Sequence, residues 1–138
     1  MSFPNLMRIR QHFDAPTVED IPESVREEVS RLNLVTRVEP GQSVAVSVGS
    51  RGINNIALIT KSLVEELKNL GLEPFLVPAM GSHGGGIAEA QREIIEGYGV
   101  TEEYVGAPIK ASMETVQVGQ TEDGVPVLPG GDAARTVV

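Results

Sequence analysis

Residues 43–86 read SVAVSVGSRGINNIALITKSLVEELKNLGLEPFLVPAMGSHGGG, and the succession of patterns within them sets the architecture that we expect. In residues 43–48, β-branched and small side chains alternate, which predicts a strand. Residues 74–78 are apolar without alternation, as in a parallel strand that is covered on both faces. Between the two lies an apolar stripe at intervals of three and four, which predicts a long helix that ends at Gly71. The stripe consists of Ile56, Ile59, Leu63, Leu67 and Leu70.

A further helix is expected after the second strand, because apolar side chains recur at helical spacing up to Gly99. These side chains are Ile87, Ala90, Ile94 and Tyr98. Strand, helix, strand and helix make a βαβα core, and such cores build parallel sheets with right-handed crossovers. The sequence therefore predicts an α/β fold with a Rossmann-like parallel sheet and flanking helices.

Weaker patterns flank this core on both sides. Residues 6–13 alternate apolar and polar side chains over most of their length, which predicts a short edge strand. A helix over residues 21–32 is expected next, capped by Asp20 and with Pro22 in its first turn.

A C-terminal hairpin is expected where residues 115–119 and 125–128 flank the turn Glu122-Asp123-Gly124. We predict one α/β domain over residues 1–128 and a frayed or truncated tail over residues 129–138.

Composition narrows the class of protein. The chain has 138 residues and no cysteine, so it has no disulfide and no thiolate metal site. A net charge of -8 argues against a nucleic-acid partner, which needs clustered basic residues. No apolar run approaches the roughly 18 residues that cross a bilayer, and the N-terminus does not resemble a signal peptide. We therefore expect no membrane partner and a cytoplasmic location.

Two glycine-rich loops follow the two core strands, namely residues 49–52 and residues 81–86. Ligands of open parallel sheets bind at the carboxyl ends of the strands, where backbone N–H groups attract anions. Each loop also carries one side chain capable of chemistry. Arg51 can pair with a carboxylate or phosphate, and the imidazole of His83 can exchange a proton near neutral pH.

The remaining side chains and glycines at this edge are expected to bind substrate. They are Ser50, Gly52, Gly81, Ser82 and Gly84, with Met80 and Asn54 lining the same edge. The alternative is that the loops are connecting turns only, with Arg51 solvated and His83 exposed. His12 is expected to be structural or at the surface.

Other kinds of site are not indicated. Neither loop has the dinucleotide-binding or the phosphate-loop motif. Two distant histidines without cysteine do not form a metal site, so no metal ligand is expected in this chain. The acidic pairs Glu27-Glu28, Glu65-Glu66 and Glu102-Glu103 are expected to be solvated faces on or near helices.

The run from Val46 to Val127 resembles the N-terminal domain of the nickel-dependent lactate racemase family. The segments that carry the resemblance are residues 48–53 (VGSRGI), 78–85 (PAMGSHGG), 98–103 (YGVTEE), 106–109 (GAPI) and 112–114 (SME). The order and spacing of these segments make the match more specific than any one of them.

This resemblance implies a function. Members of the family racemise or epimerise 2-hydroxy acids with a nickel-pincer nucleotide, and their N-terminal domain supplies an arginine and a histidine that orient the substrate and move its proton. Arg51 and His83 match these two positions. The lactate enzymes carry an aspartate and a threonine where this chain has Val48 and Ser50, and an arginine where it has Gly84. The resemblance therefore implies a different substrate specificity.

The family's second acid–base histidine, its cofactor-bearing lysine and its nickel-ligating histidine belong to a C-terminal region that would follow Val138. We therefore expect an excised domain or a short relative that is inactive alone, holds no cofactor by itself, and takes a small anionic, 2-hydroxy acid-like substrate. Its expected protein partner is the missing C-terminal domain or a second copy of the chain. The alternative is a non-catalytic α/β module that binds an anion or a partner at the same edge.

Overall fold

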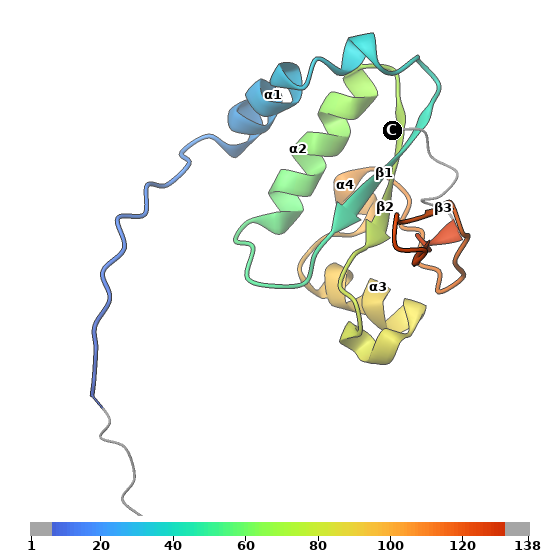
Figure 1. The fold of residues 1–138 in the computed structure, drawn as a ribbon. Coiled ribbons are helices and arrows are strands. Elements are labelled where there is room, and N and C mark those ends of the chain that lie inside the picture. Colours follow the sequence, from blue (N-terminus) through green and yellow to red (C-terminus); the bar gives the residue numbers. More distant parts are fainter. Residues whose placement is uncertain (1–6, 132–138) are drawn as a thin grey trace, which may run out of the picture.

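The two core strands pair in parallel, as the sequence predicts. The structure, a computed structural model, describes residues 7–131. Strand β1 (Ser43–Val48) lies beside β2 (Glu73–Pro78), and their register runs from Ser43 opposite Glu73 to Val48 opposite Pro78. Helix α2 (Ile56–Asn69) connects the two strands (Figure 1). This β1–α2–β2 unit positions both glycine loops.

The core forms between this sheet and α2. Alternate residues of β1, Val46 and Val48, are buried with Val64 of α2, while the intervening Ala45 and Ser47 are small and more exposed. The period of two in β1 places its valines on the face toward α2. Leu76 of β2 is fully buried at the centre of this cluster.

A third chain segment extends the sheet on the outer side of β2. Leu76 and Ile109 form an isolated parallel bridge, with the Leu76 N–H donating to the Pro108 carbonyl at 2.8 Å and the Lys110 N–H to the Leu76 carbonyl at 2.8 Å. This pairing was not predicted from the sequence. A single bridging residue gives no alternating pattern to detect.

The segment around Ile109 is fastened to its surroundings by Glu102. This residue opens the short helix α4 (Glu102–Val105) and accepts a hydrogen bond from the Ile109 N–H at 2.7 Å. Its carboxylate also lies 3.3 Å from Arg92 of helix α3 (Ala88–Gly97). A hydrogen bond to Glu96, together with the charge of Glu102, raises the pKa of Arg92. The expectation of a purely solvated acidic face therefore misses a structural role for Glu102.

Helix α1 (Ile21–Arg31) packs against α2 and begins as predicted. The Asp20 carboxylate accepts the Glu23 N–H at 2.9 Å, and Pro22 lies in the first turn. Arg26 reaches across to Glu66 of α2 at 3.3 Å. A 3-10 turn, η1 (Leu34–Thr36), then leads toward β1.

The edge strand predicted at residues 6–13 is not formed in its described part. Residues 7–13 form no strand and are exposed, and Figure 1 shows this N-terminal arm running away from the rest of the protein. Residue 6 lies outside the described residues. The alternating pattern is present, but no strand lies beside the arm to complete its backbone hydrogen bonds.

The C-terminal hairpin is confirmed but is short. Strand β3 (Gly119–Gln120) pairs antiparallel with β4 (Pro126–Val127). Pairing continues into the expected tail, since Thr115 bridges Gly130 and the Gly131 N–H donates to the Glu114 carbonyl at 2.8 Å. The rest of that tail, residues 132–138, lies outside the described residues. The architecture is thus mixed α/β, with a small parallel sheet, helices and a hairpin.

Candidate functional site

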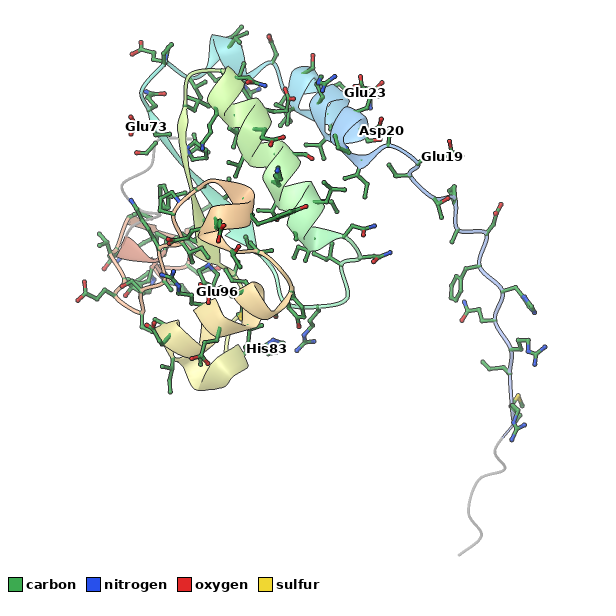
Figure 2. The ribbon with its side chains drawn as sticks, turned by 180° about the vertical axis from the view of Figure 1, so that it is seen from behind. Glu19, Asp20, Glu23, Glu73, His83 and Glu96 are labelled. Atoms are coloured by element: carbon green, nitrogen blue, oxygen red, sulfur yellow. The ribbon has the colours of Figure 1, made fainter. Side chains whose placement is uncertain are left out.

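Both glycine loops lie at the carboxyl edge of the sheet. Residues 49–52 leave β1, and residues 79–82 leave β2 and lead into the 3-10 turn η2 (His83–Gly86). In Figure 2, His83 lies at the opposite end of the sheet from Glu73, the first residue of β2. The topology therefore brings the two loops together at one rim.

The first loop is held by a tyrosine from α3's C-terminal end. The Tyr98 hydroxyl donates to the Ser50 carbonyl at 3.0 Å. Gly52 has φ +60°, a left-handed conformation that side chains with a Cβ rarely adopt. These two features fix the backbone on both sides of Arg51.

The second loop is held by a buried glutamine. The Gln91 side-chain amide donates to the Gly81 carbonyl at 2.7 Å and to the His83 carbonyl at 3.1 Å. Gly84 has φ +63°, and a Cβ there would lie 3.0 Å from the Ala90 Cβ. Gly84 therefore packs against the start of α3, which sets the path of the loop.

The side chains of Arg51 and His83 meet at this rim. The Arg51 Nη2 lies 3.0 Å from the His83 Nε2, and the Ser50 Oγ lies 2.7 Å from the His83 Nδ1. A guanidinium can only donate, so the His83 Nε2 accepts and the proton of the imidazole is on Nδ1. In this arrangement, His83 is neutral and donates to Ser50.

An open hollow of about 340 Å³ lies between the starts of the two loops. Gly49, Ser50, Arg51 and Ile53 line it from the first loop, and Ala79 and Met80 from the second. The hollow is large enough for a small carboxylate. The guanidinium of Arg51 therefore stands between an anion-sized space and the ring of His83.

Of the other predicted residues, Gly81 and Ser82 lie in the second loop, whereas Asn54 and His12 lie away from the site. Gly81 carries the carbonyl that Gln91 fixes, and its φ is +60°. Ser82 precedes η2, and its hydroxyl does not cap that turn. Asn54 lines a different groove, between α1 and α2. His12 is exposed on the N-terminal arm.

Lys110 belongs to the same rim but was not predicted from its residue type. It follows Ile109, so the parallel bridge to Leu76 brings it to the carboxyl edge of the sheet. With Gln91 and Ser112 it lines a second hollow of about 210 Å³. Its Nζ lies 4.1 Å from the centre of the Phe75 ring, a cation–π contact. Only knowledge of the bridge could have placed it here.

The described rim does not furnish a ligand set for nickel. Its one imidazole is hydrogen-bonded on both ring nitrogens, and residues 7–131 contain no group of three or more His, Cys, Asp or Glu arranged around a metal-sized space. Any nickel-pincer nucleotide would need its ligands from elsewhere.

Comparisons of this chain with models of protein families, with curated proteins and with solved structures found no match. Among the helices of residues 7–131, none combines the length and the apolar character needed to cross a bilayer.

Proposed function

We propose that this chain is the N-terminal catalytic half of a racemase- or epimerase-like protein acting on a 2-hydroxy acid. Its sheet would be the Rossmann-like core of that protein, in a cytoplasmic setting. The observation that carries the proposal is the 3.0 Å contact between Arg51 and His83. The two chemistries that a 2-hydroxy acid requires, anion binding and proton transfer, are adjacent at one strand edge.

Anion binding and proton transfer are coupled by this contact. A carboxylate entering the hollow beside Arg51 competes for the same guanidinium N–H groups, and a bidentate ion pair is stronger than a hydrogen bond to a neutral ring. Once the guanidinium turns to the anion, the lone pair of the His83 Nε2 is free to accept a proton. The Nδ1–H bond to Ser50 keeps the ring oriented meanwhile. Substrate binding would thus release the His83 Nε2 to act as the base.

The remaining machinery would come from a C-terminal domain that packs on the rim. Ile53 and Tyr98 are each about half exposed there, at 50% and 49%, and border an open hollow of about 480 Å³ together with Tyr104. Exposed apolar clusters of this kind favour contact with another domain. The nickel-pincer nucleotide that the resemblance implies would be held by that domain and not by the described rim. Alone, the chain is expected not to racemise a 2-hydroxy acid.

The second candidate is a non-catalytic anion-binding module. It is favoured by the fact that Ser50 and Arg51 engage both ring nitrogens of His83. In that case Arg51 would bind the anion and the imidazole would only position the guanidinium.

Anion titration tests the binding step. Glycolate and inorganic phosphate are titrated into the full chain by calorimetry, with Arg51→Ala as the variant. The expected result is a Kd for glycolate that rises at least about tenfold, because a charge-assisted pair is lost. Arg37→Ala is the matched control, since Arg37 is exposed and precedes β1, at the amino ends of the strands and away from the glycine loops.

Unchanged glycolate affinity in Arg51→Ala would overturn the assignment of Arg51. Binding of phosphate in preference to glycolate would favour the module over the racemase half.

A further inference from the structure

One edge of the sheet lacks a partner in residues 7–131. The Glu73 N–H donates to the Gln42 carbonyl and the Ala79 N–H to the Val48 carbonyl, so the even-numbered residues of β1 direct their backbone groups toward β2. The odd-numbered residues, Ser43, Ala45 and Ser47, therefore direct theirs to the outer edge, where no described strand lies. An unpaired edge of this kind is a template for another strand.

An apolar groove lies next to this edge. It has a volume of about 670 Å³ between α1 and α2. Its apolar lining includes Val18, Ile21, Val25, Leu32, Ile59 and Leu63. Leu32, the C-cap residue of α1, is 56% exposed. The helix α1 thus presents more apolar surface than α2 covers.

The two flanks of α2 show on which side the groove lies. On one flank, Lys61 lies over the ring of Tyr104 and Lys68 donates to the Gly106 carbonyl, beside the segment that pairs with the outer side of β2. Ile59 and Leu63 line the groove on the other flank, toward β1. The groove therefore overhangs the free edge of β1, where the side chains of an added strand would enter it.

The N-terminal arm has the sequence of such a strand. In an extended arm, Met7, Ile9 and Phe13 share one face, which is apolar except for Gln11. The opposite face is basic and carries Arg8, Arg10 and His12. The three apolar side chains are 84%, 77% and 74% exposed. Residues 7–13 hold two of the 11 Lys and Arg residues of the chain and none of its 19 acidic ones, so the arm is basic in a chain of net charge -8.

The topology accepts the arm as a parallel strand beside β1. The arm leaves the groove at Thr17 and Val18, next to Asn54 and Asn55. Those asparagines follow β1, so residues 7–13 would end at the carboxyl edge and run along β1 in the same direction. Arm, α1 and β1 would then form a second parallel βαβ unit with its helix beside α2, which is the right-handed arrangement expected of such units.

We infer that residues 7–13 are the missing strand beside β1 and that a second copy of this chain supplies it. Figure 1 shows the arm directed away from α1 and α2, between which the groove lies, so one chain leaves both an unpaired arm and an unfilled groove. Pro16 lies between the arm and α1 and favours extended backbone at Ala15. This opposes the reversal of chain direction that the arm would need to dock on its own chain. When two copies exchange their arms, each arm gains a strand partner and each groove is filled. The result is a closed, two-fold symmetric dimer.

The mass of the full chain in solution tests the inference. Sedimentation equilibrium is expected to give a dimer. Ile9→Asp is expected to raise the dimer dissociation constant by on the order of tenfold or more, since it places a charge at a buried interface anchor. Val35→Asp is the matched control, because Val35 is 66% exposed on η1, away from the groove. A monomer at all concentrations, or a dimer that Ile9→Asp leaves unchanged, would overturn the inference.

Cysteine cross-linking identifies which chain supplies the arm, and the chain has no cysteine to interfere. Arg10→Cys and Ala45→Cys are made separately, with one chain extended by a tag, and the two proteins are mixed and oxidised. A cross-linked species carrying one copy of each is expected. If the mixture gives none, while a single chain with both substitutions closes on itself as a monomer, the arm docks within its own chain and the exchange is refuted.

Discussion

Replacement of His83 by alanine is expected to lower the rate of 2-hydroxy acid racemisation by about 10²–10⁴-fold, the usual contribution of a positioned acid–base group. The chain would first be complemented with the C-terminal half of a racemase-family protein, since the chain alone is expected to be inactive. The effect should fall on kcat more than on KM. Arg51, which binds the anion, remains in place in this variant.

His12→Ala is the control for this experiment, because His12 is the other histidine of the chain and is exposed on the arm. It should leave the racemisation rate unchanged. A complemented enzyme in which His83→Ala retains the full rate would remove His83 from the chemistry and leave the anion-binding module as the better account.

Leu76→Ala is expected to lower the free energy of unfolding by about 2–5 kcal/mol, the range for truncating a buried leucine. Leu76 is fully buried, pairs with Val46 on one side, and bridges Ile109 on the other. Its side chain therefore fills the one place where all three sheet segments and α2 meet. Unfolding in urea, followed by far-UV circular dichroism, measures the loss.

The same truncation at Leu128 serves as the comparison. Leu128 is 50% exposed next to β4, so Leu128→Ala should cost less than about 1 kcal/mol. If the two variants lose similar stability, the core does not lie between the sheet and α2 as described.

Local sequence patterns predicted the elements whose contacts are made within this chain. The alternation of residues 43–48 gave both bounds of β1, and the stripe beginning at Ile56 gave α2. Asp20 and Pro22 marked the start of α1 because the cap needs only neighbouring residues. The same kind of pattern predicted a strand in the arm, where none forms. Its side chains alternate over most of its length, but pairing depends on another strand, which the sequence of the arm does not specify.

The candidate site was predictable in its location and not in its contacts. Arg51 and His83 were placed at one edge because both follow parallel strands. The direct Arg51–His83 hydrogen bond and the proton on Nδ1 follow from loop conformations fixed by Tyr98 and Gln91, two distant residues with no motif of their own. Lys110 was missed for a similar reason, since one bridging residue brings it to the rim.

The most direct test of the account is the nitrogen-15 spectrum of the His83 imidazole, recorded with and without glycolate. The neutral ring should carry its proton on Nδ1 in the free protein, and glycolate should shift the Nε2 resonance with the same midpoint as the Arg51 side-chain resonances. In Arg51→Ala, the free protein should already show the altered Nε2 signal. A proton on Nε2, or a His83 spectrum that neither glycolate nor Arg51→Ala changes, would contradict a shared anion site.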